Sequence, residues 1–405
     1  MTLALLNGRI VTPGGVIEGG VLIRDGRIAA VGPFEVPTGA QTIDVRGKLI
    51  APGIVDVGVF AIDMPAFVAG GITRALLMPD QSPPLDTVAL IQRAAAAGKP
   101  HVWIHPLAAA TKGLKGGDLA EIGLMARGGA TGVATGREWI ADSAVMLRLL
   151  SYAGALGLVT ISHPEDGGLV RGAVATESEA ATRMGLPAAP AEAEALAVQR
   201  DLLLAEITGA PIHFRQVTTA RAIDLIRAAK AKGLPVTCGI TPAHFLLSDV
   251  AMGDFRTFSR LSPPLRDEAD RLACVAALAD GTIDLICSGH DPRGPEAKRL
   301  PFSDAEPGMA GAETLLALSL ALVRDSHVPI ERLFQLLSTT PAHRFGLPAG
   351  AIEQGAEADL LIVDEHAPWR INSEQLVASA GNTPFDGLPV EGRVVTTVKG
   401  GTILG

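Results

Sequence analysis

Histidine and acidic side chains suited to metal binding or proton transfer follow several short apolar runs of this chain. They are Asp80, His163, His244 and the adjacent pair His290 and Asp291. A catalytic zinc site needs about three protein ligands on one cation and usually a base beside it. Because the sequence contains no His-x-His and no His-x-x-Glu-His, any metal site would have to be assembled from these separated residues.

These residues admit two interpretations, and the sequence leaves both open. For a single histidine such as His163 or His244, the favoured interpretation is a hydrogen-bonded side chain inside a pocket or at a helix start. In the other interpretation, His163, His244, His290 and Asp291 together form a rearranged metal site. Neighbouring side chains of a strand point to opposite faces, so those of His290 and Asp291 would diverge if they continue a strand.

A serine or cysteine nucleophile has no support in the sequence. There is no Gly-x-Ser-x-Gly motif, and the three cysteines, Cys238, Cys274 and Cys287, lie far apart in apolar contexts. Without a CxxC pair, neither a zinc knuckle nor a disulfide framework is expected. Buried thiols in a reducing cytoplasm are the simpler explanation.

Charge and hydropathy exclude several classes of protein. The net charge of the 405 residues is -9 with interspersed signs, and the lack of a basic run argues against a nucleic-acid partner. The first residues lack a basic segment followed by an apolar core, so no signal peptide is predicted. No uncharged apolar run approaches the length of a membrane span. We therefore expect a cytoplasmic protein that binds neither nucleic acid nor membrane.

Short apolar strands alternate with helical patterns through the middle of the chain. Such alternation indicates parallel βαβ units, and eight of them favour an α/β fold with a (β/α)8 (TIM) barrel. A doubly wound open sheet is the structural alternative. The expected strands are 54–60, 73–78, 101–104, 131–134, 158–162, 211–216, 235–240 and 282–287, and helices are expected at 142–156, 191–207, 220–232, 311–323 and 330–337.

The two ends of the chain share a pattern of short strands and tight turns. Asp25-Gly26 lies between the apolar runs 21–23 and 28–31, which is a strong hairpin signal. Similar strands return at 358–363 and 392–401. We therefore expect a small flanking β-sandwich domain built from residues 1–50 and 346–405. A barrel domain of residues 51–345 would lie between them.

The expected first barrel strand matters most for function, because barrels of this kind carry their chemistry at the C-terminal ends of the strands. Metal-dependent hydrolases on this fold carry two alternating histidines there, and both point into the barrel mouth. Here those two positions are Gly58 and Phe60. Neither side chain can bind a metal.

The chain resembles the dihydroorotase family of the amidohydrolase superfamily over nearly its whole length. Residues 49–56 look like the family's entry to strand one, and His163-Pro164-Glu165-Asp166 resembles its His-x-Glu-Asp motif. The other landmarks that resemble the family are 69–73, Met78-Pro79, 112–113, 191–194, 200–201, 218–221, 241–244, 308–314 and 382–385.

The departures from this resemblance fall on the family's metal ligands. Its paired strand-one histidines align with Gly58 and Phe60. Its acidic ligand after strand four aligns with Thr135 or Gly136, and its histidine after strand six with Gln216.

Three further positions concern the family's base and its substrate. The aspartate after strand eight, which serves the family as general base, aligns with Gly289. The family's substrate-binding arginine after strand one is missing, and Asp80 replaces its asparagine after strand two. Only His163 stands where the family has a metal ligand.

The resemblance, with these losses, implies a catalytically silent, pseudo-dihydroorotase-like protein. Some such homologues act as structural partners of aspartate carbamoyltransferase in pyrimidine biosynthesis. On this interpretation we expect no metal or other cofactor, and a homo-oligomer or hetero-oligomer. A vestigial pocket would contain Asp80, His163, His244, His290 and Asp291.

Two alternatives remain open. The first is an active zinc-dependent dihydroorotase, or another cyclic amidohydrolase, with a rearranged site that uses His163, His244, His290 and Asp291. The second is a barrel that binds a small molecule without turning it over.

Overall fold

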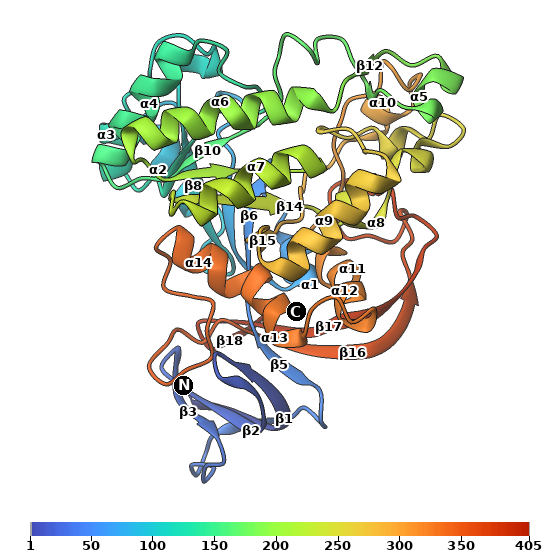
Figure 1. Cartoon of the computed structure of the whole chain (residues 1–405). Helices are drawn as coiled ribbons and strands as arrows, with labels where there is room; N and C mark the ends of the chain where they lie inside the picture. The colour runs from blue at the N-terminus through green and yellow to red at the C-terminus, as the bar shows by residue number, and fades with distance from the viewer. Residues whose placement is uncertain (1, 405) are drawn as a thin grey trace.

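The computed structural model describes residues 2–404 and confirms a parallel eight-stranded barrel (Figure 1). Its strands pair in sequence order from the first to the eighth, as expected when each is followed by a segment that returns the chain on the outside. The barrel strands are β6 (Ile54–Val59), β7 (Ile72–Leu77), β8 (Trp103–Ala109), β9 (Gly132–Ala134), β10 (Thr160–Ser162), β13 (Ile212–Phe214), β14 (Val236–Ile240) and β15 (Leu285–Ile286).

The third barrel strand differs from the sequence prediction. We expected residues 101–104, whereas β8 begins at Trp103 and continues to Ala109. The polar stretch at 99–101 is a turn, and the apolar residues that follow it form the strand. His105 consequently lies inside the strand, and its Nε2 is 3.5 Å from Nη1 of Arg74.

Helices cover the outside of the barrel (Figure 1). Asp142 caps α4, because its Oδ1 accepts hydrogen bonds from the backbone nitrogens of Ala144 (2.7 Å) and Val145 (3.1 Å). The main helices are α1 (Met64–Gly70), α2 (Val88–Ala96), α3 (Ile122–Arg127), α4 (Ser143–Ala155), α6 (Glu192–Thr208), α7 (Ala220–Ala231) and α9 (Glu268–Asp280).

Shorter helical turns fill the loops. The single helix expected at 311–323 is two short helices, α11 and α12. No helix within residues 2–404 is both long and apolar enough to cross a membrane. The short elements are α5 (Glu179–Met184), α8 (Pro242–Leu246), α10 (Pro295–Lys298), α11 (Leu315–Ser319), α12 (Ala321–Arg324), α13 (Ile330–Phe334), α14 (Thr340–Arg344), the 3-10 turns η1 (Lys112–Leu114), η2 (Asp249–Met252) and η3 (Thr257–Ser259), and the π-helical turn η4 (Gln335–Thr339).

Hydrogen bonds bring the first and last barrel strands together. The backbone nitrogen of Phe60 donates to the carbonyl of His290 at 2.9 Å. The buried carboxylate of Asp56 accepts from the backbone nitrogen of Ser288 at 2.8 Å and from the Ser288 hydroxyl. These contacts fix the ends of β6 and β15 side by side. Phe60 therefore lies beside the chain segment that follows β15.

Both ends of the chain build one eight-stranded sheet below the barrel in Figure 1. The predicted hairpin at Asp25-Gly26 is confirmed, since β2 and β3 pair antiparallel on either side of it. The division into domains at 50/51 and 345/346 stays a prediction. The strands are β1 (Thr2–Thr12), β2 (Gly15–Arg24), β3 (Arg27–Gly32), β4 (Gln41–Asp44), β5 (Leu49–Pro52), β16 (Leu360–Arg370), β17 (Pro389–Lys399) and β18 (Thr402–Leu404), while β11 (Ala175–Thr176) and β12 (Ala188–Ala189) form a separate pair.

Candidate functional site

An aromatic ring occupies the barrel mouth, the C-terminal end of the barrel strands. Phe60 follows β6, is 8% exposed and belongs to the apolar cluster inside the barrel. Two guanidinium groups lie over its ring, with Cζ of Arg137 3.8 Å and Cζ of Arg215 5.0 Å from the ring centroid. Cations within about 6 Å of an aromatic centroid are attracted by its quadrupole. Phe60 therefore holds the segments after β9 and β13 against the first strand.

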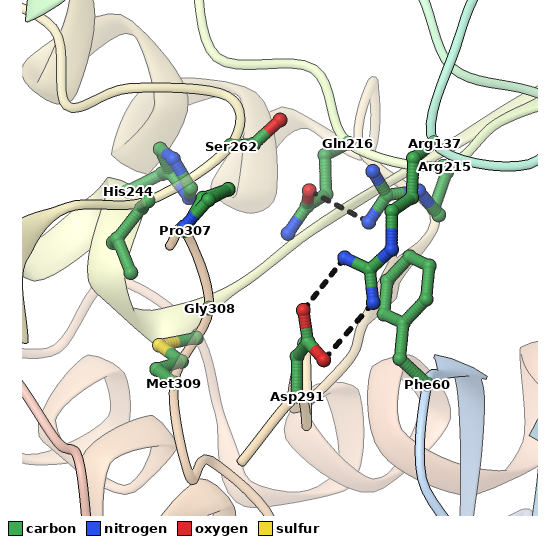
Figure 2. Close-up of a pocket in the computed structure, with 12 residues that line it drawn as sticks. Phe60, Arg137, Arg215, Gln216, His244, Ser262, Asp291, Pro307, Gly308 and Met309 are labelled. Carbon is green, nitrogen blue, oxygen red and sulfur yellow. Dashed lines mark hydrogen bonds and ion pairs between the residues drawn. The ribbon is translucent and has the colours of Figure 1, made fainter. Parts of the chain in front are cut away.

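Arg137 crosses the mouth from the loop after β9 (Figure 2). Its two terminal nitrogens donate to both carboxylate oxygens of Asp291, at 2.6 Å and 3.0 Å. Its backbone nitrogen donates to Oδ1 of Asp80 at 2.9 Å. A bidentate arginine–carboxylate pair is geometrically specific. Arg137 thereby connects the segments that follow β7, β9 and β15.

Asp80, which follows β7, is largely buried beside this arginine. Burial raises the pKa of its carboxyl group, against the opposing charge of Arg137. Within residues 2–404, Oδ2 of Asp80 has no hydrogen-bond partner. Asp80 is therefore held by the backbone of Arg137 and does not present a freely solvated charge to the mouth.

A buried hydrogen-bond chain runs behind Phe60. Nη2 of Arg215 lies 3.0 Å from Nδ1 of His163, and Nε2 of His163 lies 3.2 Å from Oε2 of Glu165. Arginine can only donate, so His163 accepts at Nδ1 and carries its proton on Nε2. Glu165 also pairs with Arg266 at 3.0 Å. Both ring nitrogens of His163 are thus engaged within the protein.

The charge state of Glu165 follows from the same chain. Burial disfavours the charged form, but the hydrogen bond from His163 and the charge of Arg266 outweigh it. Together they lower the pKa of Glu165 to about 2. The His163–Glu165 contact is therefore a histidine facing a carboxylate that stays ionised. It stabilises the proton on Nε2 and leaves neither group free for proton transfer.

Two glycines leave room that other side chains fill. Gly58 has φ 86°, and a Cβ there would lie 3.3 Å from Cδ of Arg215. Gly289 has φ 59°, and a Cβ there would lie 2.9 Å from the Thr241 methyl group and 3.2 Å from Cε of Met309. The space of a side chain at either position is therefore already occupied.

Little space remains at the mouth. The cavity there has a volume of about 20 Å³, whereas pockets for small molecules measure about 300–1,000 Å³. It is large enough for about one water molecule. Its lining includes Phe60, Arg137, Arg215, Gln216, His244, Gly289, Asp291 and Met309. As Figure 2 shows, the Arg137–Asp291 pair and Phe60 lie on one side of this space and His244 on the other.

The two other candidate histidines hold the chain in place. Nδ1 of His244 lies 2.8 Å from the Thr241 hydroxyl, and its Nε2 lies 3.0 Å from the carbonyl of Pro263. Burial lowers the pKa of His244 to about 4, so the ring is neutral near pH 7. His290 is fully buried against α1, with Nε2 3.5 Å from Asp63 and its ring edge-on to Phe67.

The structure thus separates the residues of the rearranged metal site. His244 and Asp291 line the cavity, His163 lies behind it, and His290 faces α1. Thr135 accepts a hydrogen bond from the backbone nitrogen of His163 at 3.2 Å. Among the described residues, no group of three or more His, Cys, Asp or Glu could hold a metal ion.

Sequence reasoning did not find the two arginines that dominate this site. Arg215 stands next to Gln216, and Arg137 is one residue after Gly136, so both adjoin positions where the family carries a metal ligand. The available signal was a charged residue at the end of an apolar strand pattern. It became meaningful only once Gly58 and Phe60 were seen to leave room for both guanidinium groups.

Comparison with known proteins places this geometry in context. A model of the amidohydrolase family matches residues 47–404. The chain is 38% identical to a dihydroorotase of Anaeromyxobacter dehalogenans, over 99% of this chain and 97% of that protein. It is 36% identical to a dihydroorotase of Citrifermentans bemidjiense, over 100% of this chain and 99% of that protein.

Solved structures give the same fold. The L-hydantoinase (dihydropyrimidinase) of Arthrobacter aurescens superposes with a TM-score of 0.89 at 25% identity, covering 100% of this chain and 96% of that one. The dihydropyrimidinase of Brevibacillus agri superposes with a TM-score of 0.86 at 22% identity, covering 100% and 95%. The second likeness concerns the fold alone.

The expectation that no cofactor belongs to this protein needs correction. Dihydroorotases and hydantoinases of the matched family are typically zinc-dependent, so the comparisons imply zinc where the sequence analysis expected none. The residues that this chain places at the mouth do not fit that ion. Arg137 and Arg215 carry positive charge, Phe60 offers no donor atom, and zinc in proteins is bound by Cys, His, Asp or Glu.

Proposed function

Because this chain belongs to the amidohydrolase family, we propose that it is a dihydroorotase-like protein of pyrimidine biosynthesis that does not catalyse the dihydroorotase reaction. One observation carries the proposal. The barrel mouth is filled by Phe60 and the two arginines over its ring, and the cavity that remains is about 20 Å³. A cyclic amide with a carboxylate has no room there.

The titratable side chains at the mouth support the same conclusion. Opening or closing a ring amide requires a group that moves a proton. Asp291 is bound by Arg137 on both oxygens and by Arg293 at 3.1 Å. The nitrogens of His244 and of His163 are engaged by neighbouring groups. None of these residues is free to act as a base on a ligand.

We further propose that the protein acts as a structural partner of aspartate carbamoyltransferase. The support is the contrast between a mouth without usable chemistry and a barrel whose eight strands and surrounding core are complete. A barrel that keeps its fold without usable chemistry is suited to a structural role. Co-purification with the transcarbamoylase of the same organism would test this, and separate elution of the two proteins at micromolar concentrations would contradict it.

The loss of catalysis has a direct test. Hydrolysis of dihydroorotate and ring closure of carbamoyl-aspartate should both be measured with zinc supplied. The Anaeromyxobacter dehalogenans dihydroorotase, at 38% identity, is the positive control. We expect rates for this chain that equal the buffer blank. Turnover within about 100-fold of the control enzyme, abolished by His163→Ala, would overturn the proposal, whereas turnover unaffected by that substitution would indicate a contaminant.

A second candidate is an active dihydroorotase, and the names of the curated relatives favour it. This function requires the mouth to open by displacement of Arg137 from Asp291. Ligand-dependent thermal stabilisation by dihydroorotate would support it. The same rate measurements decide between the two candidates, because only the second predicts turnover.

A further inference from the structure

A second cavity lies away from the barrel mouth, where helix α1 packs against strand β17 of the terminal sheet (Figure 1). Its volume is about 560 Å³, whereas the mouth keeps about 20 Å³. Pockets for small molecules measure about 300–1,000 Å³. We call this cavity the α1–β17 groove. Its apolar walls include Met64, Pro65, Val68, Val377, Val394 and Val395.

Contacts within the fold hold the two walls of the groove together. The Thr397 hydroxyl on β17 donates to the carbonyl of Val68 on α1 at 2.8 Å. Gly71 ends α1 with φ 78°. A Cβ there would lie 2.8 Å from a methyl carbon of Leu361 on β16 and 3.2 Å from one of Val394 on β17. Since only glycine allows this close approach, the groove is built into the fold and needs no rearrangement to form.

Apolar side chains of the groove are open to solvent. Val377 is 51% exposed and Val395 is 49% exposed, so a ligand that covers them gains from the burial of apolar surface. These walls offer aliphatic carbon atoms. A ligand with polar groups along its whole length would therefore lose hydrogen bonds to water without replacing them. The occupant that fits the groove is apolar over most of its length.

A positive charge without a partner lies in the same groove. Lys99, in the loop before β8, lines it, and among the described residues no Asp or Glu does. Nζ of Lys99 lies 5.2 Å from the centroid of the Trp103 ring. Arg74 and Lys399 face the same ring, but both are paired with Asp359. Within residues 2–404, Lys99 has no such carboxylate, so its charge is available to an anion.

We propose that the α1–β17 groove binds a medium-chain fatty carboxylate, with the tail between α1 and β17 and the carboxylate at Lys99. Exposed His101 also lines the groove and can donate a second hydrogen bond. A charge-assisted hydrogen bond at one end and apolar burial along the tail select a molecule that has both features. This inference does not depend on whether the barrel is catalytic.

Isothermal titration calorimetry of the full chain with decanoate tests the proposal. We expect one decanoate per chain, with a dissociation constant of about 1 mM or below. Decyltrimethylammonium has the same tail and the opposite charge, and it should bind at least 10-fold more weakly. Lys99→Glu should reverse this preference. Lys232→Glu places the same charge at an exposed lysine after α7 and should leave both affinities unchanged.

A second pair of variants tests where the tail lies. Val395→Glu should weaken decanoate binding at least 10-fold, whereas Val250→Glu, at a valine of η2 that is 72% exposed, should not. If Val395→Glu lowers the melting temperature, Val377→Glu places the charge elsewhere in the groove and decides the point.

Three results would overturn the proposal. The first is the absence of binding heat with decanoate up to about 5 mM, which is well above the expected dissociation constant. The second is an equal affinity of the wild-type chain for the two amphiphiles, or no effect of Lys99→Glu. The third is co-sedimentation with phosphatidylglycerol vesicles without decanoate binding, which would indicate a membrane surface instead of a free carboxylate.

Discussion

Two buried arginines, at opposite ends of this barrel, are held in different ways. Arg74, on β7, is fully buried where the barrel meets the terminal sheet. It donates to Asp359 at 3.0 Å and pairs with Glu357, and Lys399 binds the same Asp359 at 2.9 Å. Among the described residues, Arg215, at the mouth, makes its side-chain hydrogen bonds only with Gln216 and His163. Arg74 is therefore paired directly with carboxylates, and Arg215 is not.

The difference shows that the fold tolerates a buried charge without a paired carboxylate at the mouth, whereas Arg74 at the terminal sheet is paired. Burial lowers the pKa of Arg215, and Asp80 and Asp291 oppose this only from a distance. A buried charge without a paired carboxylate is expensive, whereas a buried pair is destabilised mainly when one partner is removed. We infer that the Arg74 cluster holds the barrel to the sheet. Arg215, by contrast, is buried at the mouth without a paired carboxylate.

The largest expected effect is on the Arg74 cluster. Arg74→Met should lower the free energy of unfolding by about 3–5 kcal/mol, because it leaves buried carboxylates without their partner. Urea unfolding measures this. Arg183→Met removes an exposed i,i+4 pair with Glu179 and should change it by less than about 0.5 kcal/mol. Equal effects of both substitutions would break the comparison.

Phe60→Ala should have the next largest effect. Removing a buried phenyl ring costs about 3–4 kcal/mol, and here two guanidinium groups also lose their contact with the ring. Phe60→Leu keeps most of the apolar volume and should cost about half as much. A cost below about 1 kcal/mol for the alanine variant, in the same urea experiment, would show that the mouth is not packed around Phe60.

Both regions should lose stability in acid, because each contains a buried histidine that is neutral in the folded protein. Burial lowers the pKa of His244 at the mouth, and of His105 beside Arg74, to about 4 each. The unfolded chain takes up protons near its ordinary pKa of about 6.5, so stability falls as the pH drops from 6.5 toward 4. Each histidine contributes up to about 3 kcal/mol to this loss. His244→Gln should flatten the stability profile over this range, and an unchanged profile would contradict the assignment.

The smallest effect should come from Arg215. Arg215→Met relieves the cost of burying the guanidinium charge, and it also removes the hydrogen bonds to Gln216 and His163. These two contributions to the free energy of unfolding have opposite signs and should offset within about 1 kcal/mol. The measurement is the same urea midpoint, and its contrast with Arg74→Met is the sharpest form of the comparison. Destabilisation as large as that of Arg74→Met would mean that the charge of Arg215 is compensated after all.

The sequence predicted the fold because its signals are local. Strand patterns, Asp25-Gly26 and the helix spacing at 142–156 each depend on neighbouring residues, and the structure confirms them. The prediction for the third strand was wrong. The expected strand ended at residue 104, whereas β8 continues through His105 and Pro106 to Ala109.

The mouth was only partly predictable, because its contacts join distant residues. The positions of Gly58, Phe60, Gln216 and Gly289 could be named from a family pattern. What fills the space could not, since Arg215 takes the room beside Gly58 only when β6 and β13 face each other across the barrel. The pairing of Arg137 with Asp291 likewise spans 154 residues of sequence.

The backbone at Gly58 has a consequence for the introduction of a metal ligand. A residue other than glycine at φ 86° is strained, and any side chain there would meet Arg215. A single substitution to histidine would therefore restore a ligand type without a place for it. If the chain does not catalyse the dihydroorotase reaction, as proposed, a metal ligand at this position would require the backbone, Arg215 and Phe60 to change together.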